Sequence, residues 1–161
     1  NVAAHPELVR REFAEGHSIG HHTFSHPLLD HMAPAAAWEQ IVKGVRADEQ
    51  ALTAAARAQA TTPFFRFPGF ASTPALLDRA QAAGLVVFGA DVWASDWRSQ
   101  TPDEELKLLL ERIEKVDHGI VLLHDTRAQT ARMLPALLRA LKARGYRIVH
   151  VVAAGPSRPL E

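Results

Sequence analysis

The sequence predicts an α/β fold built on parallel strands, and two observations favour it. Short apolar runs alternate with longer amphipathic segments along the chain. These runs are continuous in their hydrophobicity, as in strands that are covered on both faces, whereas a strand with one solvated face alternates apolar and polar residues. Strands that alternate with helices in this way imply a parallel sheet or a barrel.

The composition bounds the class of protein. A chain of 161 residues, with 47% hydrophobic and 22% charged residues, fits one folded domain with a single core. Lys plus Arg number 18 and Asp plus Glu 18, so no net charge attracts nucleic acid or an anionic membrane. No apolar run approaches the ~20 residues of a membrane helix. Cysteine is absent, which excludes disulfides, thiolate nucleophiles and cysteine-based zinc sites.

The first part of the chain predicts two helices and a strand. Pro6 opens a helical pattern that Gly16 ends. Residues 35–60 are rich in Ala, Gln, Glu and Arg, with apolar residues on one face, and predict one long amphipathic helix that is eased at Gly44. Residues 64–67 form an apolar run that suits a buried strand.

The middle of the chain predicts two more helices with a strand between them. Thr73 and the proline after it predict an N-cap and the first position of a helix that ends at Gly84. Residues 85–90 read as a strand. The same capping pattern recurs at residues 101–104, with acidic residues in the first turn, and predicts a helix that runs to about Val116.

The last part predicts a strand, a helix and a final strand. Residues 120–123 are a continuous apolar strand, residues 129–143 a helix that Gly145 ends, and residues 146–152 the last strand. In parallel α/β folds the functional site lies at the carboxyl ends of the strands.

Polar residues follow the predicted strands at these ends. Arg66 follows one strand, Asp91 and Asp96 the next, and His124 and Asp125 a third. If the histidine cluster near residue 22 lies at the same rim, four separate segments converge there.

Two histidines give the sharpest local signal. His22 and His26 are four residues apart, a spacing at which both imidazoles can reach one ion from a helical turn or a tight loop. With cysteine absent, nitrogen and carboxylate oxygen remain as ligands, which suits zinc or another divalent transition metal. The alternative is that the five histidines between residues 17 and 31 form a polar surface loop.

The other polar residues have ordinary interpretations too. His124 could be a hydrogen-bonded structural residue at a strand end, and Arg66 an ion-pair partner. Asp96 could cap a helix beside a core tryptophan, Trp97. None of these signals decides the function alone.

Their order resembles a known family. Residues 16–27 (GHSIGHHTFSHP) resemble the H-[ST]-x-x-H motif of the polysaccharide deacetylases, with His21 in place of the usual Asn. Residues 65–70 (FRFPGF) resemble the third motif, which more often reads R-P-P-Y-G. Residues 91–97 (DVWASDW) and 120–125 (IVLLHD) are similar to the fourth and fifth motifs, in the family order.

The resemblance implies a fold and an activity. The fold would be an incomplete, distorted (β/α) barrel that lacks its N-terminal strands, because the family's first motif, T-F-D-D-G-P, is not in this sequence. The catalytic domain would span residues 1–157, and residues 158–161 would be a tail that could derive from an expression vector. The full-length protein would remove N-acetyl groups from an N-acetylglucosamine-containing glycan, outside the cytoplasm. This chain alone would be inactive, because the first motif supplies the catalytic base and the third metal ligand.

The resemblance also implies roles for five residues in the chemistry. His22 and His26 would be two of three ligands of a divalent metal, most simply zinc, with cobalt or nickel as alternatives. His124 would be the general acid that protonates the leaving amine, and Asp96 would hold it. Arg66 would orient the catalytic aspartate of the first motif.

Further residues would bind the substrate or support the site. Trp97 and Leu122 would form the apolar pocket for the acetyl methyl group, and Phe70 part of the groove wall. Asp91 and Asp125 would support the residues that act. No nucleic acid and no membrane insertion are expected.

Two other interpretations stay open on the sequence alone. One is a catalytically inactive module that binds carbohydrate or metal, which the missing aspartates would produce. The other is a structural α/β domain with incidental histidines, in which no metal binds at His22 and His26.

Overall fold

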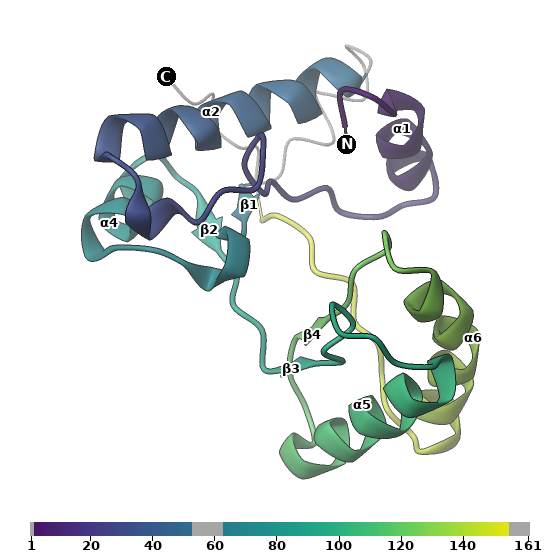
Figure 1. The fold of residues 1–161 in the computed structure, drawn as a ribbon. Coiled ribbons are helices and arrows are strands. Elements are labelled where there is room, and N and C mark those ends of the chain that lie inside the picture. The colour runs from purple at the N-terminus through teal and green to yellow at the C-terminus, as the bar shows by residue number, and fades with distance from the viewer. Residues whose placement is uncertain (1, 53–62, 155–161) are drawn as a thin grey trace. The chain divides into compact units, whose positions relative to one another are not determined.

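The computed structural model describes residues 2–52 and 63–154, which belong to two compact units (Figure 1). One unit comprises Asn1–Phe88 with His150–Glu161, and the other comprises Gly89–Val149. The predicted tail at residues 158–161 lies outside the described residues.

The described residues of the first unit form three helices and two short 3-10 turns. The helices are α1 (Pro6–Ala14), α2 (Pro34–Ala51) and α4 (Pro74–Ala82), and the turns are η1 (Leu29–His31) and η2 (Pro68–Phe70). Each of the three helices has proline in its first turn, where the missing N–H group costs no hydrogen bond. The predicted helix over residues 35–60 is confirmed as far as residue 51, and most of its remainder lies outside the described residues.

A short parallel ladder lies in the first unit. Strand β1 (Phe64–Phe65) pairs in parallel with β2 (Val86–Val87), and His21 forms a parallel bridge to Phe65. The predicted strands at residues 64–67 and 85–90 are therefore present but shorter. His21 is thereby placed beside the carboxyl end of β1, so the ladder brings the histidine segment to the residue that follows this strand.

Apolar side chains from the helices and from β1 form the core of the first unit. Leu29, Ile41 and Phe65 are among its fully buried side chains. Trp38 packs there too, and the Arg79 guanidinium lies 4.3 Å from the centre of its ring. The core fixes the face that α2 turns inward, which decides which of its residues meet the histidine segment.

The second unit repeats the pattern with two helices. Strand β3 (Val92–Trp93) pairs in parallel with β4 (Val121–Leu122). Helix α5 (Pro102–Val116) begins at the predicted N-cap, Thr101, with a capping box in which Thr101 and Glu104 exchange hydrogen bonds with each other's backbone N–H groups. Helix α6 (Ala128–Ala143) packs against α5. The core lies between these elements and contains Val92, Ala94, Leu109, Ile113, Met133, Leu137 and Leu141.

One predicted strand is wrong. Residues 146–152 form no strand, and the side chains of Ile148 and Val149 are 69% and 70% exposed. Their apolar, β-branched pattern favours extended backbone, but a strand also needs a hydrogen-bonded neighbour, which the described residues do not give it. Conversely, β3 lies in a segment for which the sequence predicted no strand.

The fold class is confirmed at the level of a mixed α/β fold with short parallel strands. Within the described residues, each unit contains a two-stranded parallel sheet whose strands are separated in the chain by a helix, α4 in the first unit and α5 in the second. Two such pairs do not by themselves show a closed barrel, so the barrel stays a prediction.

Candidate functional site

The first group of site residues lies in the loop over residues 21–26. The Nδ1 atom of His22 lies 2.7 Å from the backbone carbonyl oxygen of Arg66. A carbonyl accepts only, so Nδ1 carries the hydrogen and Nε2 is the ring nitrogen that has the lone pair when the imidazole is neutral. The ring centres of His22 and His26 are 4.8 Å apart, at an interplanar angle of 73°. The two imidazoles are thus neighbours, as the four-residue spacing predicted.

The backbone of this loop is strained. Thr23 and His26 have φ values of 65° and 60°, in the left-handed region that side chains with a Cβ atom rarely adopt. The Thr23 hydroxyl accepts a hydrogen bond of 3.2 Å from the backbone N–H of His26, which links the two strained residues. Such conformations cost about 1–3 kcal/mol each and persist only where the surroundings hold them.

The two imidazoles fit part of a metal site. A catalytic zinc site usually takes three protein ligands, and neutral imidazole nitrogens with a hydrogen-bonded second nitrogen are among its commonest. His22 meets this description through the Arg66 carbonyl. Within residues 2–52 and 63–154, no group of three or more His, Cys, Asp or Glu side chains could hold a metal ion. The described residues therefore supply two candidate ligands.

Arg66 and Phe70 follow β1 in the same unit. The backbone N–H of Arg66 donates to the His21 carbonyl at 3.0 Å, so β1 carries Arg66 directly beside the histidine loop. The Arg66 side chain is partly buried, and burial lowers the pKa of its guanidinium. Phe70 is 44% exposed and has a φ of 58°. An aromatic ring that is open to solvent can contact a sugar, and this role for Phe70 stays a prediction.

The second group centres on His124 and Asp96 in the second unit. Asp96 follows β3 and is completely buried, whereas the His124 side chain, which follows β4, is 37% exposed. The Asp96 carboxylate accepts from the Nδ1 atom of His124 at 2.8 Å and from its backbone N–H at 2.7 Å. Thr130 donates to the same carboxylate at 3.2 Å. The imidazole is therefore fixed with hydrogen on Nδ1, which leaves Nε2 for proton exchange.

Trp97 and Leu122 flank this pair. Trp97 is 48% exposed, and its ring is perpendicular to that of His124, with the centres 6.3 Å apart. Leu122 is the last residue of β4 and is partly buried. Both residues are close in the chain to the Asp96–His124 pair, and their role in holding an acetyl methyl group stays a prediction.

The two other aspartates differ in their contacts. The Asp91 carboxylate accepts from the backbone N–H of Ile120 at 2.7 Å. Its side-chain atoms also lie 2.7 Å from the position that a Cβ atom on Gly119 would take. Asp91 thus ties the start of β3 to the turn before β4. Asp125 is exposed, and its side chain makes no hydrogen bond or ion pair with the residues that the structure describes.

Comparison with known proteins identifies the family. Residues 1–88, more than half of the chain, match the family model described as polysaccharide deacetylase. The chain belongs to the polysaccharide deacetylase family. The match covers α1, the histidine loop, α2, β1 and Arg66, so the motif assigned to residues 16–27 lies within it.

Two curated deacetylases are similar over nearly the whole chain. A chitooligosaccharide deacetylase of Bradyrhizobium sp. (strain ANU 289) is 33% identical, with 91% of this chain and 70% of the relative covered. A peptidoglycan-N-acetylglucosamine deacetylase of Listeria monocytogenes (strain 10403S) is 29% identical, with 94% of this chain and 30% of that protein covered. The chain thus spans most of the first relative and under a third of the second.

Solved deacetylase structures share the fold. The chain superposes on a peptidoglycan deacetylase of Bdellovibrio bacteriovorus with a TM-score of 0.85 at 30% identity, covering 96% of this chain and 42% of that one. A family 4 carbohydrate esterase of Streptomyces lividans, solved with acetate, gives a TM-score of 0.77 at 23% identity, covering 96% of this chain and 79% of that one. The second likeness concerns the fold alone.

The deacetylase motifs form two groups in the structure. His22, His26 and Arg66 lie together in the first unit, and Asp96 and His124 in the second. Each group was predicted from strand ends and motif order. That both groups line one cavity, as the family resemblance implies, stays a prediction.

Glu105 is a buried acid that no sequence pattern singled out. Glu105 is 0% exposed, and neither of its carboxylate oxygens has a hydrogen bond of ordinary geometry in the described part of the chain. Burial raises the pKa of Glu105, and the negative charge of Asp96 adds to the rise, while the nearby Thr130 hydroxyl opposes it. The sequence predicted acids in the first turn of α5, but Glu104 caps the helix, and the next residue, Glu105, turns into the core.

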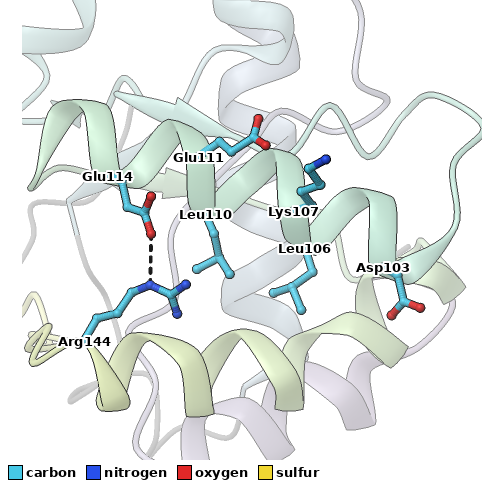
Figure 2. A pocket seen from close by; sticks show the side chains of 7 residues that line it. All are labelled: Asp103, Leu106, Lys107, Leu110, Glu111, Glu114 and Arg144. Carbon is cyan, nitrogen blue, oxygen red and sulfur yellow. Dashed lines mark hydrogen bonds and ion pairs between the residues drawn. The ribbon is translucent and has the colours of Figure 1, made fainter.

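Two grooves in the described part of the chain are lined by none of the predicted site residues. One, of about 340 Å³, runs between α5 and α6 (Figure 2). Leu106, Lys107 and Arg144 are among the side chains that line it, and Arg144 forms an ion pair of 3.0 Å with Glu114 across it. The other groove, of about 710 Å³, lies beside α1 and α2. Neither contains a residue of the family motifs other than Phe24.

No helix in the described ranges has the length and apolar character that a membrane crossing requires.

Proposed function

We propose that this chain belongs to an enzyme that hydrolyses N-acetyl groups on an N-acetylglucosamine-containing glycan in a metal-dependent reaction. The observation that carries the proposal is the histidine His124, whose Nδ1 is held by a buried carboxylate and whose ring is partly open to solvent. Membership of the polysaccharide deacetylase family supports it, as do relatives named for chitooligosaccharide and peptidoglycan N-acetylglucosamine.

His124 would act on the leaving group. Hydrolysis of an acetamide adds the oxygen of water to the acetyl carbon and breaks the C–N bond, so the nitrogen must leave as an amine. The protonated imidazole of His124 donates from Nε2 to that nitrogen as the bond breaks, and acetate and the free amine result. Asp96 holds the opposite side of the ring and stabilises its positive charge before the transfer.

His22 and His26 would hold a divalent ion through ring nitrogens, which for His22 means Nε2 because Nδ1 contacts the Arg66 carbonyl. Zinc is the simplest choice for two imidazoles and a carboxylate, and cobalt and nickel are alternatives. Such an ion, when bound, supplies Lewis-acid activation of the acetyl carbonyl and of water. The family resemblance places the third ligand and the catalytic base on aspartates of the first motif. A chain without that motif is expected to be inactive.

Three exposed or half-buried side chains would bind the substrate. Trp97 stands against His124, so a methyl group near the indole would lie close to the proton donor. Leu122 adds apolar surface from β4, and Phe70 contributes an exposed ring after β1. Arg66 would orient the first-motif aspartate. These strands would belong to a distorted barrel that the full-length chain completes, and the enzyme would act outside the cytoplasm.

Acetate release from N-acetylglucosamine oligomers by the full-length protein tests the proposal. We expect release that a chelator abolishes and that zinc restores. His124→Ala should lower turnover by about a hundredfold to ten-thousandfold, the usual contribution of a general acid. His118→Ala, which changes an exposed histidine in the same unit, serves as the control. Near-normal release by the His124 variant would remove His124 from this role. No release by the full-length wild type would favour the inactive module instead.

A further inference from the structure

One stripe of α2 faces the histidine loop. Gln40, Gly44 and Asp48 are four residues apart, so they lie one above another on the same side of the helix. Each of these three residues contacts a different part of residues 21–25. From the sequence alone, Gly44 is only a point where the long helix eases.

The two ends of the stripe make hydrogen bonds to the loop. The backbone carbonyl of Gln40 accepts from the backbone N–H of Phe24 at 3.0 Å. The Gln40 side-chain oxygen accepts from both the backbone N–H and the hydroxyl of Ser25, each at 3.1 Å. At the other end, Asp48 lies 2.7 Å from Nδ1 of His21, and these two residues are 8% and 7% exposed. Hydrogen bonds from α2 therefore hold the loop on both sides of His22.

Gly44 lies in the middle of the stripe, and its lack of a side chain lets the loop backbone approach the helix closely. A Cβ atom on Gly44 would lie 2.6 Å from the carbonyl carbon of Thr23 and 2.8 Å from its oxygen. Both are backbone atoms, so no flexible side chain can move aside. Glycine in a helix interior makes the helix less stable than alanine would, so helix stability does not explain Gly44. The close approach of the Thr23 backbone explains it.

The strained backbone of the loop explains why the contacts with α2 are needed. Positive φ values occur at Thr23, which packs against Gly44, and at His26, which is the second candidate ligand. A loop with two such residues relaxes unless its neighbours hold it. The carbonyl of Arg66 orients the ring of His22, but it does not act on residues 23–26. Residues 23–25 instead contact α2, through Gln40 and Gly44.

We propose that the stripe of Gln40, Gly44 and Asp48 is a positioning device that holds the strained loop so that His22 and His26 present their ring nitrogens to one metal ion. This inference rests on the proposed function for the metal, but the positioning of the loop can be measured without it. The three residues of the stripe act through the loop and do not touch the ion. Residues that orient metal ligands in this way typically change metal affinity by 10–100-fold when they are mutated.

The first test is hydrogen exchange on the metal-free, full-length protein. In Gly44→Ala, the amides of Phe24 and Ser25 should exchange at least about tenfold faster than in wild type, while the amides of α2 stay protected. Glu49→Ala, on the same helix but outside the stripe, is the matched control and should leave both amides unchanged. If Gly44→Ala fails to fold, Gln40→Ala removes only the side-chain acceptor of Ser25 and should still speed exchange of that amide, with Gln50→Ala as its control.

The second test is the affinity for Co²⁺, followed by its visible absorption in the same full-length protein. Gly44→Ala and Asp48→Ala should each weaken binding by about 10–100-fold. Asp48→Asn keeps an oxygen that accepts from His21, so it should restore most of the affinity that Asp48→Ala loses. A residue that only stabilises the fold would change the unfolding temperature without this rescue of affinity.

The positioning role of the stripe and the proposed metal site can be refuted independently. Unchanged exchange at Phe24 and Ser25 in Gly44→Ala would overturn the positioning role, whatever the metal does. If wild type binds Co²⁺ no better than His22→Ala, the proposed metal site is wrong, and the exchange result still decides whether the stripe holds the loop.

Discussion

Replacing Asp96 with asparagine should cost both stability and the orientation of His124. The Asp96 carboxylate is completely buried and accepts three hydrogen bonds, two from His124 and one from Thr130. Asparagine keeps one acceptor oxygen and turns the other position into an N–H donor. If its oxygen faces Nδ1 of His124, its amino group meets the backbone N–H of the same residue, and that donor loses its partner.

The magnitude follows from these contacts. The Thr130 hydroxyl can rotate and accept from the new amino group, so its bond is not lost. The backbone N–H of His124 loses a bond to a charged acceptor, which is worth about 1.5–3 kcal/mol, and it stays partly buried without a partner. We therefore expect Asp96→Asn to lower the free energy of unfolding by about 2–4 kcal/mol. The opposite amide orientation would instead move the hydrogen of the imidazole from Nδ1 to Nε2.

Two measurements check this prediction. Chemical denaturation gives the free energy of unfolding, and ¹⁵N NMR of the histidine rings gives the tautomer of His124. Asp103→Asn, an exposed acid in the first turn of α5, is the control and should lose less than about 1 kcal/mol. A loss below about 0.5 kcal/mol in Asp96→Asn, with an unchanged tautomer, would refute the reasoning, because surface substitutions fall within that range.

Three further predictions follow from single residues. In the full-length protein, His22→Ala should lose stoichiometric metal by elemental analysis, whereas His31→Ala, an exposed histidine of a 3-10 turn, should keep it; retention by His22→Ala would place the ligands elsewhere. Burial raises the pKa of Glu105 above its ordinary value of 4.5, so the folded state binds the proton more tightly than the unfolded state does. The free energy of unfolding therefore falls as the pH rises from about 4.5 through the raised pKa of the folded state. Glu105→Gln should therefore be more stable than wild type at pH 7 by about 1–3 kcal/mol and nearly equal at pH 3, with the exposed Glu111→Gln as control; equal stability at pH 7 would contradict this. Thr101→Ala removes the capping box of α5 and should cost about 1 kcal/mol in thermal or chemical unfolding, and no loss would mean that the cap contributes nothing.

The helix starts could be predicted because their causes are local. Thr73 and Thr101 each accept a hydrogen bond from a backbone N–H group three residues later, and each precedes a proline in the first turn. These interactions depend on neighbours in the sequence, so the sequence alone contains the information. The predicted helices begin at or within one residue of those positions.

The strands could be predicted only in part, because a ladder needs a partner from elsewhere in the chain. The apolar runs at Phe64 and Val121 pair with distant segments, but the run at residues 146–152 does not. Both kinds of run look alike in the sequence, since β-branched residues favour extended backbone in either case. The pairing itself is a tertiary fact.

The candidate site shows the same division. The spacing of His22 and His26 predicted that their rings would be neighbours, and motif order linked Asp96 with His124. The spacing could not show that Gly44 receives Thr23, because that contact joins residues 21 positions apart. Nor could it show which of two adjacent acids in α5 turns inward, because one residue of helical phase decides between solvent and core.

The most direct test of the account is anomalous diffraction at the zinc edge from crystals of the full-length protein grown with zinc. We expect one strong peak about 2.0–2.1 Å from a ring nitrogen of His22 and of His26. We also expect the imidazole of His124 in the same cavity, within reach of a bound acetamide. A zinc peak on other residues, or His124 on a separate surface from His22 and His26, would contradict it.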